Sequence, residues 1–220
     1  MKLRLAIGAA LSLAAVQPVV VAAQSSAAPV PLEFGVGFGD LARSVSFSRD
    51  IGSRSFWNNR ANVNWGLRAS FIFGDGIPHF GVGDEVDTLR VSDQKLLVGN
   101  FMVGVGVKLT DNIELAANVD LIGLTLGTER GALLANPSYS RQTVAPVWFN
   151  AFGFGSDRTR GSLNSQLYLL YNVSDEFKLK LGFSNLWTDY ALQNPAIGSP
   201  IRFRSTLPTV FAGVRWTPKE

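Results

Sequence analysis

From Leu32 onward, apolar residues alternate with small or polar residues along most of the chain. In residues 61–73, Ala, Val, Trp, Leu and Phe fill the odd positions, while Asn, Gly, Arg and Ser fill most even ones. This period of two is typical of β-strands, because helical spacing would scatter the apolar residues around the helix axis. One clearly predicted strand covers residues 59–73. The others begin at Leu32, Lys95, Ile113, Ser162, Phe177 and Leu207.

The connections between these segments alternate in length. Residues 110–112 and 172–176 are short turns, whereas residues 128–161 and 189–206 are long polar and aromatic stretches. Short turns at one end and long loops at the other are typical of an outer-membrane barrel, with the turns in the periplasm. No window after the N-terminal segment is apolar over the 18 or more residues of a membrane helix.

An even strand count requires one more strand, which we place within residues 77–93 after a turn at Gly74-Asp75-Gly76. Residues 59–73 then run toward the periplasmic turns, and both termini lie in the periplasm. The fold prediction is therefore all-β: an antiparallel up-and-down transmembrane barrel of eight strands over residues 32–217, followed by a tail at 218–220.

The polar face of such a barrel lines its interior, and the apolar face contacts lipid. The charged residues on the polar parity form the predicted interior network: Arg68, Lys108, Glu114, Asp120, Lys178, Lys180 and Arg215. Because eight strands enclose little more than their own side chains, we expect these charges to pair and fill the lumen. Interior glycines such as Gly35 and Gly104 leave a narrow polar conduit open as an alternative.

Aromatic residues near the strand ends predict the interfacial girdle of a membrane barrel. We expect Tyr171 and Trp216 at the periplasmic rim, and Trp57, Trp187 and Tyr190 at the outer rim. Period alone does not separate this membrane barrel from a soluble periplasmic ligand-binding barrel, in which the apolar face would point inward.

Residues 1–23 have the parts of a secretory signal peptide: basic Lys2 and Arg4, an apolar segment, and small residues ending at Ala23. We predict cleavage after Ala23 and a short leader at residues 24–31. Removing the two basic residues lowers the formal net charge from +3 to +1, so the composition gives no support for nucleic-acid binding.

The candidate chemistry is sparse. The chain has no cysteine and a single histidine, His79, which excludes disulfides, thiolate zinc sites and cysteine nucleophiles. We expect no cofactor, no metal and no catalytic activity. A lipid-modifying enzyme built on His79 is the weaker alternative, because a catalytic histidine needs a nucleophile and an acid beside it.

The long connections are where a specific binding function would lie. The candidate binding residues are Arg141, Trp148, Phe149, Arg158 and Arg160, since Arg and aromatic side chains suit lipopolysaccharide phosphates or a protein partner. The alternation around Phe149 fits equally well with a simple extension of the neighbouring strand. Residues 201–204 can likewise extend the last strand outward.

The closing segment Phe211-Ala212-Gly213-Val214-Arg215-Trp216-Thr217 resembles the last-strand assembly signal of small eight-stranded outer-membrane barrels of the OmpX, OmpW and OmpA-transmembrane type. The chain departs from them at Pro218, where those proteins end in an aromatic residue. The resemblance implies an outer-membrane protein that meets the assembly machinery, outer-membrane lipids and lipopolysaccharide. We expect a structural or loop-mediated binding role, with a pore for small or apolar solutes as the alternative.

Overall fold

The computed structural model describes residues 30–82, 87–135, 142–153, 159–193 and 201–219. Fourteen β-strands make up this part of the chain, and they join in one sheet whose pairings are all antiparallel. This confirms the predicted all-β antiparallel fold. Within the same residues, no helix has the length and apolar character needed to cross a membrane. The predicted signal peptide and most of the leader lie outside the described residues.

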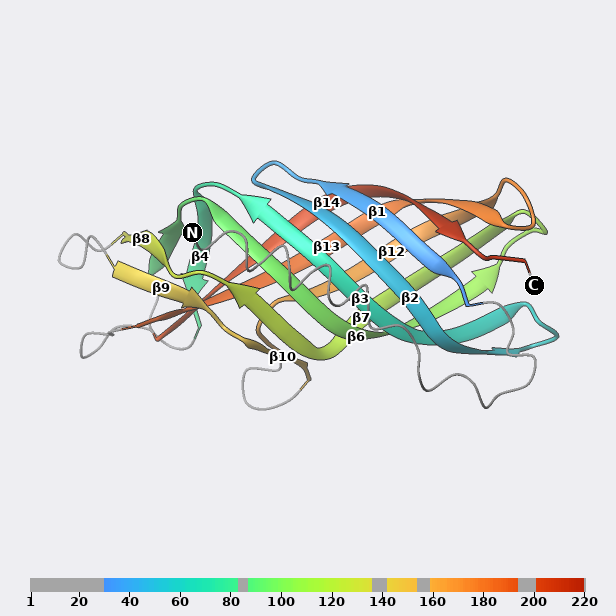
Figure 1. Ribbon diagram of the computed structural model, residues 1–220, viewed down its shortest axis with the longest axis horizontal. Helices are drawn as coiled ribbons and strands as arrows, with labels where there is room; N and C mark the ends of the chain where they lie inside the picture. The colour runs from blue at the N-terminus through green and yellow to red at the C-terminus, as the bar shows by residue number, and fades with distance from the viewer. Residues whose placement is uncertain (1–29, 83–86, 136–141, 154–158, 194–200, 220) are drawn as a thin grey trace.

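Eight of the strands pair side by side in a closed ring (Figure 1). The ring strands, in order, are β1 (Leu32–Phe38), β2 (Ala42–Phe56), β3 (Ala61–Gly74), β6 (Gln94–Lys108), β7 (Ile113–Gly127), β12 (Leu163–Asn172), β13 (Phe177–Leu192) and β14 (Arg202–Trp216). The first and last strands close it, with Leu32 opposite Trp216 and Phe38 opposite Val210. Closure leaves no open sheet edge around the ring.

The two ends of the ring differ. At one end, which we call the turn end, the chain reverses through residues 57–60, 109–112 and 173–176. The C-terminus lies beside these turns (Figure 1). At the other, the loop end, the connections carry six short strands. These are β4 (Ile77–Gly81), β5 (Thr88–Val91), β8 (Arg130–Leu134), β9 (Gln142–Pro146), β10 (Phe149–Phe152) and β11 (Thr159–Arg160).

Four of the short strands form a smaller second ring, which we call the cap. From β14 the pairing runs through β4, β5, β8 and β9 and returns to β13. One apolar cluster joins inward residues of the cap to inward residues of five ring strands, and so it fills the loop end of the lumen. Its fully buried members include Ile72, Ile77, Leu89, Val91, Leu96, Val144, Leu186, Tyr190 and Phe203.

The sequence-based prediction was wrong about two strands. Residues 42–56 form β2, which was not predicted, and residues 77–93 contribute the cap hairpin β4–β5 instead of a ring strand. As a result β3 runs toward the loop end, and Gly74-Asp75-Gly76 lies there, opposite to the prediction. The cause is the sequence of β2, which has serines on its inward face, arginines among its outward residues, and an irregularity between Asp50 and Gly52 that shifts the alternation.

Candidate functional site

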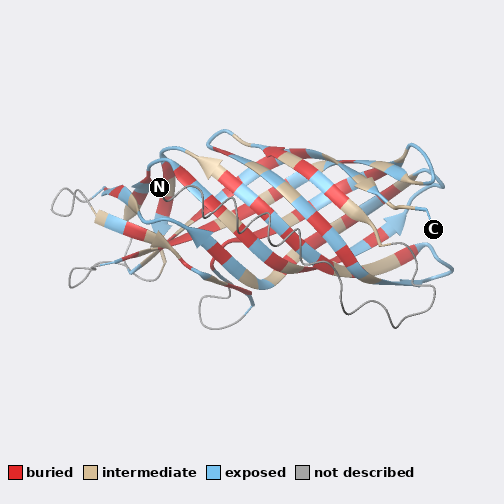
Figure 2. Ribbon diagram, viewed as in Figure 1, coloured by how far each residue is buried: buried red, intermediate tan, exposed pale blue. Residues whose placement is uncertain are grey.

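Every ring strand presents large apolar side chains to the outside. Along the strands, exposed and buried residues alternate as the period of two requires (Figure 2). Exposed representatives, one from each ring strand, are Phe34, Phe47, Phe71, Val105, Leu124, Leu169, Phe183 and Val210. A continuous apolar belt of this extent marks a surface that contacts lipid or another apolar partner.

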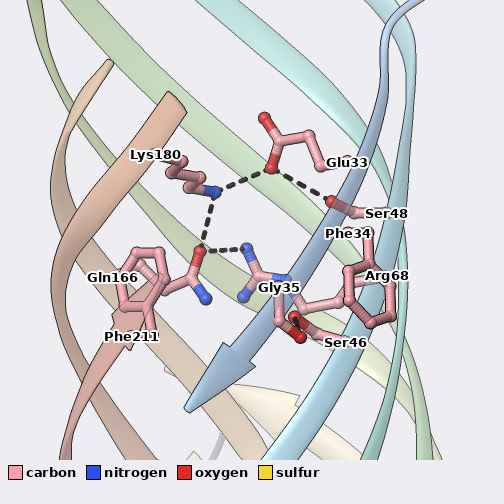
Figure 3. Close-up of a pocket in the computed structure, with 9 residues that line it drawn as sticks. All are labelled: Glu33, Phe34, Gly35, Ser46, Ser48, Arg68, Gln166, Lys180 and Phe211. Atoms are coloured by element: carbon pink, nitrogen blue, oxygen red, sulfur yellow. Dashed lines mark hydrogen bonds and ion pairs between the residues drawn. The ribbon is translucent and has the colours of Figure 1, made fainter. Parts of the chain in front are cut away.

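The inward face carries a charged network near the middle of the barrel (Figure 3). Arg68 Nη1 lies 3.0 Å from Asp120 Oδ1, and both side chains are almost fully buried. Lys180 Nζ lies 2.7 Å from Glu33 Oε2. Gln166 Oε1 accepts hydrogen bonds from Lys180 at 3.0 Å and from Arg68 at 3.3 Å, so it joins the two ion pairs.

The network continues toward the turn end. Arg215 forms an ion pair with Asp50 and lies 3.5 Å from a Glu33 oxygen. Nearer the rim, Glu114 accepts a 2.7 Å hydrogen bond from Asn62 Nδ2 and lies 3.7 Å from Lys178 Nζ. Opposite charges thus neutralise one another along this length of the lumen, as buried charges require.

Six of the seven predicted interior residues belong to this network. Lys108 is the exception, because it follows the inward parity but is exposed at the turn end. Prediction also missed two acids, Glu33 and Asp50, which supply the counter-charges of Lys180 and Arg215. Glu33 lies with glycines on the polar face of the first strand, so the alternation alone could have identified it as an inward residue. Asp50 lies on the strand that was not predicted.

The charged network encloses a small cavity. A cavity of about 10 Å³ lies among Glu33, Ser48, Arg68 and Gln166, enough for a single water molecule (Figure 3). Interior glycines do not widen it: a Cβ at Gly37 would lie 2.5 Å from Ser44 Oγ. Side-chain atoms likewise lie 3.2 Å or less from the Cβ positions of Gly35, Gly104 and Gly106. The side chains of neighbouring residues therefore fill the space beside these glycines.

His79 lies inside the cap, fully buried. Its Nε2 lies 3.0 Å from Thr188 Oγ1, its Nδ1 lies 3.0 Å from the Ile77 carbonyl oxygen, and its ring packs edge-on against Tyr190. Burial lowers the pKa of His79 to about 4, so the imidazole is neutral at pH 7. Both ring nitrogens already have partners, and the described residues place no carboxylate in hydrogen-bond contact with them.

The predicted girdle is only partly formed. Tyr171 and Trp216 are exposed at the turn end, where Trp216 stacks on Phe177, and Trp187 lies toward the loop end, half-buried. Trp57 was misplaced, because it sits in the β2–β3 turn at the turn end. Tyr190 was also misplaced: it points into the cap core and is fully buried.

Two of the five predicted loop residues, Arg141 and Arg158, lie outside the described residues. Trp148 is exposed beside Phe149, with their ring centroids 5.7 Å apart. Phe149 begins β10, which pairs with β7 directly beyond the end of the β7–β12 pairing. The segment is therefore a strand that extends the sheet, and Trp148 immediately precedes it. Residues 202–204 extend β14 outward as expected.

No family model and no curated protein matches the sequence. Among solved structures, the chain is similar to a de novo designed transmembrane β-barrel, with 9% identity, coverage of 89% of this chain and 99% of that one, and a TM-score of 0.39. It is also similar to the outer membrane enzyme PagL (9% identity, 86% and 99% coverage, TM-score 0.40). A third is the outer membrane protein Ail of Yersinia pestis (14% identity, 86% and 100% coverage, TM-score 0.33). Two of these three neighbours, PagL and Ail, are outer-membrane proteins, and the other is a designed transmembrane barrel.

Proposed function

We propose that the protein is an integral outer-membrane β-barrel whose eight ring strands cross the membrane and whose role is structural or loop-mediated binding. The observation that carries this proposal is the reversal of faces, with apolar side chains outside on every ring strand and ion-paired charges inside. A soluble barrel needs the opposite arrangement, because its exterior must be hydrated.

The interior supports a closed lumen. Ion pairs and amides fill the middle, one apolar cluster fills the loop end, and the cavity between Glu33 and Arg68 has room for only about one water molecule. The state of His79 supports a non-catalytic role, since the ring is buried and both nitrogens are engaged within the protein. Binding would then fall to the loop end, where Trp148 and Arg160 are exposed.

In this proposal the turn end faces the periplasm and the loop end faces outward, as in barrels with short periplasmic turns. The partners are lipids, lipopolysaccharide among them, together with the outer-membrane assembly machinery. Export would depend on the predicted signal peptide at residues 1–23.

Gel mobility of the detergent-refolded protein with and without boiling tests the membrane barrel. A closed sheet with every backbone group paired resists dodecyl sulfate until heated, so we expect a compact, fast-migrating band that shifts on boiling. The refolded protein should also enter the detergent phase on partitioning. A single boiling-independent band, with protein that stays monomeric in buffer without detergent, would instead establish a soluble barrel.

A further inference from the structure

The β2–β3 hairpin carries a surface at the turn end that the barrel itself does not use. Residues 53–60 are all exposed, and the pair of strands runs out to the right-hand end of the molecule in Figure 1. Toward the turn end of this hairpin, Arg49, Arg54 and Arg60 are exposed together with Phe56 and Trp57.

The positive charge of this hairpin is not balanced locally. The chain has no Asp or Glu from residue 51 to residue 74, and within the described part of the chain none of the three arginines forms an ion pair. The acids of the turn end, Asp111, Asp175 and Glu176, lie on the other two turns, where Glu176 pairs with Lys219 at 3.0 Å. The turn end therefore has a basic side.

Arg49 and Arg54 lie beside outward apolar side chains of β3. In the β2–β3 pairing Arg49 is opposite Leu67 and Arg54 is opposite Val63, both of which belong to the outward face of β3. The ring of Trp65 covers Gly52 on the same outward face, since a Cβ there would meet the indole at 2.5 Å. Cations thus follow the apolar side chains of this face toward the turn end.

The turn itself holds an aromatic residue in an unfavourable backbone conformation. Trp57, Asn58 and Asn59 all have left-handed φ angles, of 54°, 53° and 61°, and Arg60 N donates to the Trp57 carbonyl at 3.1 Å. Asn suits the two central positions of such a turn, but a bulky residue with positive φ is an outlier. Trp57 nevertheless occupies it with 68% of its surface exposed. Strain of this kind points to a use for the side chain.

We propose that this hairpin surface binds the phosphate headgroups of anionic phospholipids in the leaflet at the turn end, through Arg54 and Arg60 with Trp57 lying at the interface. Guanidinium groups match phosphate oxygens in charge and fork geometry. Tryptophan favours the level of the headgroups, where its ring is buried and its N–H is solvated. The inference rests on the proposed membrane barrel, because only in a membrane does the turn-end edge of the apolar belt meet lipid headgroups.

Lipid retention by the refolded full chain tests the proposal. The protein is extracted from phosphatidylcholine vesicles that contain phosphatidylglycerol, and the bound lipids are counted by mass spectrometry. We expect enrichment of phosphatidylglycerol that falls about fivefold for each arginine replaced in Arg54→Gln and Arg60→Gln. Arg90→Gln, which removes an exposed cation from the cap at the loop end, should leave the enrichment unchanged.

Tryptophan quenching provides a second readout. Brominated phosphatidylglycerol should quench the wild-type emission more than that of Trp57→Leu, and this difference should vanish when both arginines are replaced. Equal enrichment in the wild type and the double variant, or none in the wild type while its gel band still shifts on boiling, would overturn the lipid site and leave the barrel standing. Loss of the band shift in the wild type would overturn both.

Discussion

At the scale of single residues, Arg68 is the centre of the interior network. It donates to Asp120, Asn118 and Gln166, and it is buried with all three. Removing one member of a buried ion pair leaves the other charge without compensation, and this costs more than the pair contributes in isolation. The stability of the barrel therefore depends on completeness of the network more than on the number of its ion pairs.

We predict that Arg68→Ala lowers the free energy of unfolding by about 3–5 kcal/mol, because Asp120 stays buried without its cation. Urea unfolding of the vesicle-embedded protein, followed by tryptophan fluorescence, measures the change. Lys108→Ala is the matched control: this inward but exposed lysine forms no ion pair with any described residue, so its loss should change stability by less than about 0.5 kcal/mol. Similar costs for the two variants would contradict the role of Arg68.

Parity alone identified six members of the interior network, because a charge on the polar face of a lipid-facing strand has nowhere else to point. It could not identify which charges meet. Lys180 and Glu33 are 147 positions apart in the chain, and their contact depends on closure of the ring between β1 and β14. Trp57 was misplaced for a related reason, since its position depends on β2, a strand whose arginines and serines hide the period of two.

At the scale of elements, the strands approach one another closely where glycine permits it. On β13, a Cβ at Gly182 would lie 2.7 Å from the Tyr168 Cα of the neighbouring β12. Because the obstacle is backbone, the two strands would have to move apart. On β6, by contrast, Gly99 faces outward with nothing within 4 Å of its Cβ position.

We predict that Gly182→Ala destabilises the protein by about 1–3 kcal/mol, the usual cost of forcing an extra methyl group into a packed site. Gly99→Ala should be neutral or slightly stabilising, since it adds apolar surface to the belt and restricts the unfolded chain. To compare the two variants, samples are heated to a series of temperatures before electrophoresis. The midpoint is the temperature at which half of the folded band has shifted. A midpoint for Gly182→Ala at or above that of Gly99→Ala would refute close packing between β12 and β13.

The cap is the element whose stability should depend on pH. The folded-state pKa of His79 is lowered by burial from 6.5 to about 4. The hydrogen bond to the Ile77 carbonyl and the nearby charge of Asp189 oppose this shift only in part. Between these values the unfolded form binds the proton more strongly, so the stabilisation is complete above about pH 6.5 and is lost as the pH falls toward 4. The shift corresponds to about 3 kcal/mol.

We therefore predict that amide exchange in residues 77–81 and 88–91 accelerates at pH 4.5 relative to pH 7, after correction for the intrinsic rate. Residues 113–120 of β7, which lie far from His79, serve as the internal reference. His79→Gln removes the titration, so its cap should show the same protection at both pH values. A wild-type cap with pH-independent protection would mean that protonation of His79 is not coupled to opening.

At the scale of the whole molecule, sequence reasoning identified the closed antiparallel architecture but not the cap. The ring follows from a period of two that repeats along the chain. The cap strands are four or five residues long and pair across connections, β5 with β8 and β9 with β13, so their pairing leaves almost no local pattern. Residues 77–93 were therefore interpreted as a ring strand whose alternation is interrupted by Pro78 and the glycines around it.

The cap and the charged network obstruct the lumen one after the other along the barrel axis. Together they predict a barrel that does not conduct ions. A permeating ion would have to separate Arg68 from Asp120 or Lys180 from Glu33, and it would then meet a buried cluster of mainly apolar side chains. We expect the refolded protein to show no discrete conductance in planar bilayers. Removal of the β4–β5 hairpin of the cap, by replacing residues 77–91 with a short Gly-Ser linker, should leave the barrel closed, because the network remains. Adding Arg68→Ala and Lys180→Ala to that deletion should produce ion flow. Stable single-channel steps in the wild type would instead identify a pore and overturn the closed lumen.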